Sequence, residues 1–440
     1  MSDDKAPNDI WDANELMRFN DPLKAGSPYY VATEKGRGDI KFKELLRGLG
    51  VNAQSMKLVN PPQSRYIAFC GHRGCGKSTE LNQLSVRLDK PELFLVVQMD
   101  ATEELDVNNI QYPDVLIALA KVLIKRLEAE KIVVDKVHLS RLNDWFFERI
   151  EKNETTQTYA SELKVGAKGE VGLPFIGKLF ASVTNSFKIN ATDKDELRRV
   201  IKNSFSELAY AFNLLVRGAE EDIQKQNTKR KLLFIVDGCD RLRGDDCKRF
   251  FIEDVHQHQL IKSNFIYSCP INLLHEGYQL HQNFQTFILP MIKVEEKDGE
   301  PNPAGYQVLR DMMLKRADIG LFESGETLDR AIKYSGGNPR ELIRILQTTF
   351  THTDTDTYDA ISLDKALHNL AVDYKRFLKH HDYHHLYAID HKQEPDWESE
   401  REDFLLYNLA LLEYNNFWRR SNPLITLLKE YQSLGSNKEE

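Results

Sequence analysis

Short apolar runs of strand length recur along the chain as far as Leu289. There are five of them, and most are apolar at successive positions: Tyr66–Cys70, Leu93–Met99, Leu232–Val236, Phe265–Ser268 and Thr286–Leu289. This pattern is typical of strands covered on both faces, as in a parallel sheet with flanking helices. Between the runs, apolar residues recur at helical spacing, at Leu81, Leu84 and Leu88 and at Val115, Leu119, Val122 and Leu123. The alternation predicts an α/β fold built on a doubly wound parallel sheet.

A long insertion separates the second run from the third, because roughly 130 residues lie between them and one crossover helix needs far fewer. Its first part looks helical through Trp145–Phe147. Its middle, Ala160–Phe187, is rich in glycine, alanine and apolar residues, and Pro174 and Gly177 would interrupt a helix. Two interpretations of this middle part stay open: a hairpin or loop docked on the core, or a contact for a partner or second subunit.

The remaining segments predict helices and connections. Residues 1–25 are expected to form a loose lead-in, followed by a helix over Ile40–Leu49. A helix should restart at Thr192, with Asp195 three residues later as a capping-box signal. The charged stretch Glu295–Pro303 predicts a linker, and residues 304–350 predict only helices. The last 80 or so residues look mainly helical, apart from an irregular patch at Asn415–Pro423.

Composition excludes several classes of protein. Hydrophobic residues make up 41% and charged residues 29%, which suits a sizeable core and argues against a disordered chain or a fibre. The net charge of −8 does not favour a general nucleic-acid or anionic-membrane binder. We expect no signal peptide at MSDDKAPND and no membrane-spanning run. The five cysteines, Cys70, Cys75, Cys239, Cys247 and Cys269, show no metal-site spacing. This predicts a soluble protein of a reducing cytoplasm.

The strongest chemical signal is GHRGCGKST, Gly71 to Thr79, between the first predicted strand and a helix. It fits the phosphate-loop pattern G-x-x-x-x-G-K-[ST]. Its glycines let backbone N–H groups point at phosphate oxygens, and the following helix presents its positive end to them. Lys77 is expected to reach the β- and γ-phosphates and the Ser78 hydroxyl to ligate Mg²⁺. The expected phosphate-binding residues are Gly71, Gly74, Cys75, Gly76, Lys77, Ser78 and Thr79.

A second signal is KLLFIVDGCDRL, in which Asp237 closes the third predicted strand. An acidic group there can hold Mg²⁺ opposite the phosphate loop. Asp240 follows three residues later, on the turn. We expect Lys77 and Asp240 to be the catalytic residues, with Asp240 orienting or deprotonating an attacking water. The structural alternative for Asp240 is a turn-capping aspartate.

The stretches GHRGCGKSTEL, LLFIVDGCDRL and SGGNPREL resemble those of P-loop ATPases of the AAA+/STAND group. The resemblance covers roughly residues 28–430, and the first two stretches are its specific part. It implies ATP as the nucleotide and a five-stranded sheet followed by a helical lid and a winged-helix-like domain. The expected units are an N-terminal lead-in and helix at 1–60, an ATPase core at 61–295 with the insertion at about 101–230, a lid at 296–355 and the winged-helix-like domain at 356–440.

The resemblance also implies roles for single residues. Ser268 matches the polar sensor at the end of the fourth strand, although a serine closing a strand is commonplace. Arg340 would touch the γ-phosphate and report nucleotide state to the lid; Pro339 and Asn338 equally suit a simple helix start. Tyr30, Val31 and Arg37 lie where such proteins often build part of the adenine pocket.

The chain departs from the family pattern at Asp237-Gly-Cys-Asp240, because standard AAA+ motors have an adjacent Asp-Glu. The glutamate that polarises water is missing, so hydrolysis is expected to be slow or to depend on Asp240. No arginine finger can be assigned, with Arg241 and Arg249 as candidates. If such an arginine acts across a subunit boundary, hydrolysis requires assembly, and its effect on rate is roughly 10³–10⁵-fold.

Two further features lie outside these motifs: a histidine cluster, and a C-terminal stretch with aromatic and basic residues. The histidines of KHHDYHH, His380, His381, His384 and His385, form i,i+4 pairs on a helix. They suit either a metal site completed by Asp382 or His391, or a solvated or partner-facing polar patch. In the C-terminal stretch Tyr414 and Trp418 would flank the wing of a winged helix, but Arg419 and Arg420 are a weak electrostatic footprint for DNA.

Three functions follow as hypotheses. The favoured one is an ATP-binding and hydrolysing switch or assembly platform that controls its own oligomerisation or a separate effector protein; bacterial proteins of this type often serve in antiphage defence, by family analogy only. The alternatives are a nucleic-acid-acting ATPase, such as a loader or remodeller, and a pseudo-ATPase scaffold that keeps its nucleotide. A membrane role is not expected.

Overall fold

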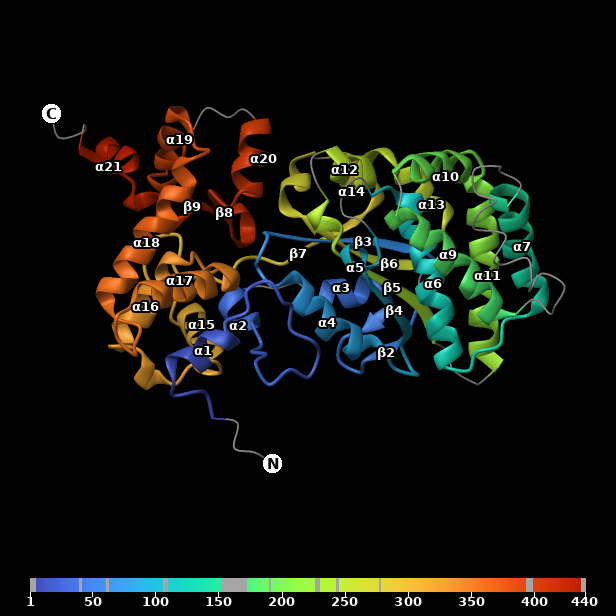
Figure 1. The fold of residues 1–440 in the computed structure, drawn as a ribbon, viewed down its shortest axis with the longest axis horizontal. Helices are drawn as coiled ribbons and strands as arrows, with labels where there is room; N and C mark the ends of the chain where they lie inside the picture. The colour runs from blue at the N-terminus through green and yellow to red at the C-terminus, as the bar shows by residue number, and fades with distance from the viewer. Residues whose placement is uncertain are drawn as a thin grey trace.

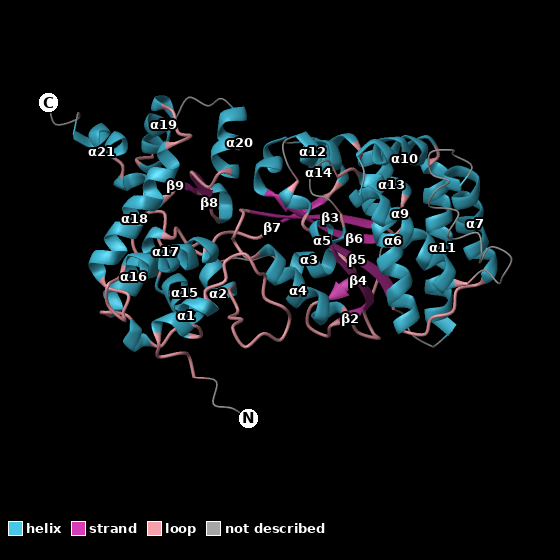
Figure 2. Ribbon diagram, viewed as in Figure 1, coloured by secondary structure: helices cyan, strands magenta, loops and turns pink. Residues whose placement is uncertain are grey.

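The core is a five-stranded parallel sheet with helices on both faces (Figures 1 and 2). The computed structural model describes residues 5–38, 42–60, 63–105, 110–151, 172–189, 191–225, 230–242, 245–276, 278–392 and 399–436. The strand order is β4-β5-β6-β3-β7, all parallel. The strands are β3 Arg65–Gly71, β4 Phe94–Asp100, β5 Lys231–Asp237, β6 Asn264–Pro270 and β7 Gln285–Ile288. All five predicted strands and the α/β fold class are confirmed.

The continuous apolar runs arise because each strand serves two cores. Leu233 packs into the core shared with α4 (Lys77–Leu88), and the next residue, Phe234, packs into the core shared with α6 (Tyr112–Ala129) and α11 (Phe205–Lys225). Successive side chains of a strand point to opposite faces, so both must be apolar when helices cover both faces. The carboxyl ends of β3 and β5 lie on either side of β6 at one edge of the sheet.

The insertion forms a helical lobe at the far end of the sheet, on the right in Figure 1. It contains α6, α7 (Lys136–Phe146), α9 (Leu173–Ile189), α10 (Ala191–Asn203) and α11. The hairpin-or-loop interpretation is wrong for residues 173–187, which are helical; residues 160–171 lie outside the described residues.

Two residues explain why a hairpin or loop was expected where the structure has helix α9. Pro174 lies in the first turn of α9, where a missing N–H costs no helical hydrogen bond. Gly177 faces α6, and a Cβ there would lie 3.1 Å from Cγ2 of Ile124. The glycine therefore permits close helix packing. Thr192 is also inside α10 and not its cap, because this helix already begins at Ala191.

A second lobe, on the left in Figure 1, follows the sheet. It comprises α15 Pro303–Leu314, α16 Gly325–Tyr334, α17 Pro339–His352, α18 Ala360–Lys375, α19 His380–Asp390, α20 Ser399–Tyr407, β8 Leu411–Glu413, β9 Arg419–Ser421 and α21 Lys429–Ser436. One hydrophobic core runs through these elements. The predicted lid and C-terminal unit thus share a core across residues 355 and 356. The irregular patch contains β9 and the turn that joins it to β8; the two strands form an antiparallel hairpin in which Leu411 pairs with Ser421.

The N-terminal segment is not a loose lead-in. Helix α1 (Ile10–Leu16) buries Ile10 and Ala13 in the core of the second lobe, and the ring of Trp11 meets that of Phe350 edge-on at 4.9 Å. The shorter elements are α2 Glu34–Arg37, α3 Phe42–Gly48, β1 Val51–Asn52, β2 Lys57–Leu58, α5 Ala101–Glu104, α12 Asp245–Lys248, α13 Val255–Leu260 and α14 Tyr278–Asn283. Among the described helices, none combines the length and apolar character needed to cross a bilayer. All five cysteines are buried thiols.

Candidate functional site

The phosphate loop connects β3 to α4 and closes tightly. Gly74 and Gly76 have φ of 79° and 101°, in the left-handed region that favours glycine. A Cβ at Gly74 would also lie 2.7 Å from Oδ1 of Asn338 and 2.8 Å from Cβ of Arg340. A glycine is therefore required at position 74 for two reasons: its φ is positive, and the close approach of α17 leaves no space for a Cβ.

Lys77 is buried at the start of α4 and is held by its own loop. Its Nζ donates to the carbonyl oxygens of Gly71 at 2.8 Å and His72 at 2.9 Å, and lies 2.9 Å from Oδ2 of Asp240. Burial lowers the pKa of Lys77, but Asp240, together with Cys75 and Asp237, raises it above its ordinary value. Burial alone would raise the pKa of Asp240, but Lys77 and a hydrogen bond from Ser268 hold it below its ordinary value. The two form a charged pair.

Asp237 ends β5 beside this pair. Burial raises its pKa, Asp240 adds to the effect, and a hydrogen bond with Ser78 opposes it. Within the described structure, Oδ1 of Asp237 is buried without a hydrogen-bond partner. A divalent cation would satisfy that oxygen and relieve the repulsion between the carboxylates. Hard oxygen donors such as Asp237 and Ser78 fit Mg²⁺.

Ser268 reaches the site through Asp240. It lies on β6, the strand between those of the phosphate loop and Asp237, and its Oγ donates to Oδ1 of Asp240 at 3.2 Å. The structure thus brings four sequence-predicted residues together: Lys77, Asp237, Asp240 and Ser268.

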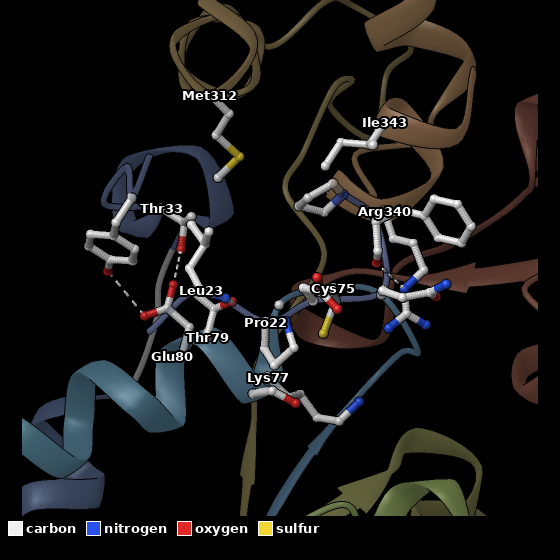
Figure 3. Close-up of a pocket in the computed structure, with 18 of the residues that line it drawn as sticks. Pro22, Leu23, Thr33, Cys75, Lys77, Thr79, Glu80, Met312, Arg340 and Ile343 are labelled. Carbon is white, nitrogen blue, oxygen red and sulfur yellow. Dashed lines mark hydrogen bonds between the residues drawn. The ribbon is translucent and has the colours of Figure 1, made fainter. Parts of the chain in front are cut away.

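A pocket opens above the loop, between the sheet and the second lobe (Figure 3). Of the predicted residues, it is lined by Tyr30, Val31, Arg37, Gly74, Cys75, Gly76, Lys77, Ser78, Thr79, Asp240 and Arg340. Arg241 also lines it. Arg249, the other finger candidate, instead pairs with Asp246 and Glu253.

Arginines gather at one side of this pocket. Burial lowers the pKa of Arg340, and the nearby charges of Arg241 and Arg73 lower it further. Within the described residues, none of the three guanidinium groups forms an ion pair with a carboxylate. In a chain of net charge −8, such a group of cations facing a phosphate loop favours a polyanionic ligand.

Two of the predicted adenine-pocket residues, Arg37 and Tyr30, are held in the wall of the pocket by hydrogen bonds. Arg37 is almost fully buried: its Nη2 donates to the carbonyl of Cys75 at 2.6 Å, its Nε donates to Oγ1 of Thr33 at 2.7 Å and its Nη1 donates to the carbonyl of Pro290. Its guanidinium thus supports the phosphate loop through the carbonyl of Cys75. Tyr30 donates from its hydroxyl to Oε2 of Glu80 at 3.3 Å.

Residues 18–31, here called the N-terminal strap, form one wall of the pocket. The backbone N–H of Leu23 donates to Oγ1 of Thr79 at 3.1 Å, and Asn82 donates to the carbonyl of Leu23 at 2.9 Å. Arg340 donates from Nε to the carbonyl of Phe19 at 3.2 Å. The strap therefore joins α4 of the sheet lobe to α17 of the second lobe. The sequence pointed to Tyr30 and Val31 but not to residues 18–23, whose hydrogen bonds to Thr79, Asn82 and Arg340 are made by the backbone of Phe19 and Leu23.

The second lobe contacts the phosphate loop directly. Asn338 caps α17 and donates from Nδ2 to the carbonyl of Arg73 at 2.9 Å. The guanidinium carbon of Arg73 lies 5.2 Å from the centroid of the Tyr407 ring on α20. Sequence reasoning missed Arg73, Glu80 and the lid residues Met312, Arg316 and Ile343 in the lining. Arg73 lies inside the phosphate-loop motif and Glu80 directly follows it. No sequence pattern around the lid residues indicated that they line a site.

Among the described residues, the histidine cluster does not form a metal site. His380 and His384 lie together on α19 with ring centroids 4.8 Å apart. The candidate ligand Asp382 instead accepts from Arg401 Nε at 2.8 Å and from the N–H of Lys379 at 2.6 Å. In the part of the chain that the structure describes, no three metal-ligating side chains converge. Arg419 and Arg420 are likewise occupied, by Glu413 and Glu295 respectively.

No protein-family model and no curated protein matches the chain. Similar solved structures include a Walker-type ATPase of Pyrococcus abyssi, with 13% identity and a TM-score of 0.43 over 94% of this chain and 99% of that one. Cdc6p of Pyrobaculum aerophilum is 13% identical with a TM-score of 0.38 over 94% and 98%. The RuvB Holliday junction branch migration motor of Thermotoga maritima is 14% identical with a TM-score of 0.25 over 53% and 83%. The strand order, phosphate loop and Asp237 themselves place the chain in the P-loop NTPase fold.

Proposed function

We propose that the chain is a cytoplasmic ATPase that uses ATP and Mg²⁺ to switch between assembly states. The observation that carries this proposal is that one phosphate loop presents Lys77 and is also bonded to the second lobe through Asn338. A ligand that reshapes the loop must therefore disturb its contact with that lobe. Through this contact a bound nucleotide can stabilise one conformation of the protein more than the other, which is what a switch requires.

The residues divide the chemistry among them. Lys77 and Arg340 bind and orient the phosphates, and the strap with Met312 and Ile343 supplies an apolar wall for a base. Ser78 and Asp237 would hold Mg²⁺, which neutralises charge on the β- and γ-phosphates. Asp240 stays ionised and orients the attacking water once Lys77 turns toward phosphate. Because Asp240 replaces the usual glutamate, we expect slow turnover.

Of the two candidates for an arginine finger, Arg241 is the better placed to support hydrolysis within one chain, because it lines this pocket and Arg249 does not. The partners we propose are further copies of this chain and a separate effector protein. A role in antiphage defence is the biological setting suggested by the family resemblance of the motifs.

The test is the particle mass with and without ATP and Mg²⁺, measured for the wild type and Lys77→Ala. We expect a nucleotide-dependent change in mass for the wild type alone. If neither the particle mass nor the affinity for the effector changes with nucleotide or with the substitution, the protein is not such a switch. Multiple-turnover phosphate release separates it from a scaffold that only holds nucleotide.

A nucleic-acid-acting ATPase is the second candidate. The observation that favours it is the tip of the β8–β9 hairpin, where Phe417 is 75% exposed with a left-handed φ of 55°. Exposed aromatic rings near basic groups suit base stacking, and Lys297 and Lys392 line the same groove as Phe417. DNA-stimulated hydrolysis at low salt, lost in Phe417→Ala, would support this candidate; no stimulation would oppose it.

A further inference from the structure

Glu80 is a buried carboxylate in the wall of the phosphate-loop pocket. It lies on α4 one turn after Lys77 and is 5% exposed. Its Oε1 accepts from Oγ1 of Thr33 at 2.9 Å and its Oε2 from the hydroxyl of Tyr30 at 3.3 Å (Figure 3). All three side chains line the pocket.

These two bonds leave Glu80 with spare acceptor capacity. A carboxylate offers about four lone-pair sites, and the structure shows one side-chain donor on each oxygen. Burying a carboxylate carries a cost that further donors would reduce. Holding the N-terminal strap in place would not by itself require a charged side chain at position 80.

The position of Glu80 along α4 indicates which part of a nucleotide it meets. Lys77 and Ser78 face the phosphates, and each later residue of a helix lies about 1.5 Å further along its axis. In Figure 3, Lys77, Thr79 and Glu80 follow one another along α4, with Met312 and Ile343 across the pocket. In a nucleotide, the sugar lies between the α-phosphate and the base. On this spacing we place the sugar beside Glu80, and the hydroxyl groups of a sugar are hydrogen-bond donors.

We propose that Glu80 accepts a hydrogen bond from a ribose hydroxyl and makes the site selective for ribonucleotides over deoxynucleotides. This inference rests on the proposed function, because it requires a nucleoside triphosphate on the phosphate loop. Thr33 and Tyr30 act as positioning residues that hold the carboxylate toward the pocket. A site built to bond a hydroxyl rejects the analogue that lacks it, since its buried acceptor is then left without that donor.

The test compares the dissociation constants of ATP, 2′-deoxy-ATP and 3′-deoxy-ATP, with Mg²⁺, for the wild type, Glu80→Ala and Thr33→Val. We expect the wild type to bind at least one deoxy analogue roughly 10- to 100-fold more weakly than ATP. In Glu80→Ala this ratio should fall to about one. Thr33→Val removes one of the two hydrogen bonds that position Glu80 but keeps the carboxylate and the bond from Tyr30, so it should weaken all three ligands together and preserve most of the ratio.

The outcomes separate the two proposals. If the wild type binds ATP but both deoxy analogues equally well, or if Glu80→Ala keeps the wild-type ratio, the sugar-reading role is wrong and the ATPase proposal is untouched. A merely structural role for Glu80 predicts that second result, since loosening the strap affects every ligand alike. If the folded wild type binds none of the three, the proposed function itself fails.

Discussion

His72, the second residue of the phosphate loop, accepts a hydrogen bond at Nε2 from the backbone N–H of Glu413, 2.8 Å away. Glu413 ends β8, the first strand of the C-terminal hairpin. Both residues are buried. The phosphate loop is thus bonded to the C-terminal hairpin as well as to α17, and these contacts connect the candidate nucleotide site to the rest of the second lobe.

Removing this acceptor should loosen the hairpin. In His72→Leu the N–H of Glu413 stays buried without an acceptor, which costs about 1–3 kcal/mol. Hydrogen exchange of the Glu413 amide should accelerate roughly 5- to 150-fold, because local opening becomes easier by that free energy. His256→Leu, at an exposed histidine of α13, is the matched control. Unchanged exchange in His72→Leu would show that the bond has no role in holding β8.

Acid should destabilise the protein through two buried histidines. Burial lowers the pKa of His72, with a further contribution from Lys77, and burial lowers that of His258; each falls to about 3. Unfolded histidine has a pKa near 6.5, so below that pH the unfolded state binds protons that the native state does not. Stability should fall by about 1.4 kcal/mol per pH unit for each histidine between pH 6.5 and 3.

Urea unfolding at several pH values between 7 and 5 checks this. In His258→Gln the pH slope should decrease by about one proton relative to the wild type. The comparison isolates this histidine, since carboxylates contribute equally to both proteins. Identical slopes would contradict the assignment of His258 as neutral in the native state.

The Lys77–Asp240 pair should show strong non-additivity. Lys77→Met leaves the buried carboxylate of Asp240 without its cation and should cost about 3–5 kcal/mol of stability. Adding Asp240→Asn removes that charge and should restore most of the stability, but not ATP binding. Denaturant unfolding and titration with a fluorescent ATP analogue measure the two effects. Additive losses of stability would argue against a coupled pair.

Asp237→Asn should separate magnesium binding from phosphate binding. The substitution removes the charge that we assign to Mg²⁺ while leaving the phosphate loop intact. ATP affinity with Mg²⁺ should fall at least about tenfold, and affinity in EDTA should stay the same or rise. Calorimetry under both conditions, with the exposed Asp298→Asn as control, tests this. Equal effects with and without Mg²⁺ would remove Asp237 from the metal site.

Arg340→Ala should abolish any preference for ATP over ADP, because Arg340 is the α17 side chain that we assign to the γ-phosphate. The matched control is Arg344→Ala on the same helix, whose guanidinium pairs with Glu341 and Asp373. The measurement is the ratio of the two dissociation constants. A preserved ratio in Arg340→Ala would assign it only to anchoring the strap at Phe19.

The sequence predicted what is local in the chain. The strands and the loop at Gly71–Thr79 were recognisable because apolar runs and glycine spacing belong to contiguous residues. Pro174 suggested a break in the chain, because a proline disrupts a helix interior, but it lies in the first turn of α9, where proline is favourable. The bonds of His72 to Glu413 and of Arg73 to Asn338 span hundreds of residues. Only the fold brings these groups together, so no pattern in the chain predicts them.

The central claim is that the phosphate loop binds ATP and transmits its presence to the C-terminal hairpin. Hydrogen exchange over Leu411–Ser421, measured with and without saturating ATP and Mg²⁺, tests it most directly. We expect a nucleotide-dependent change in the wild type and none in Lys77→Met/Asp240→Asn. Unchanged exchange in a wild-type protein shown by calorimetry to be saturated with ATP would contradict it.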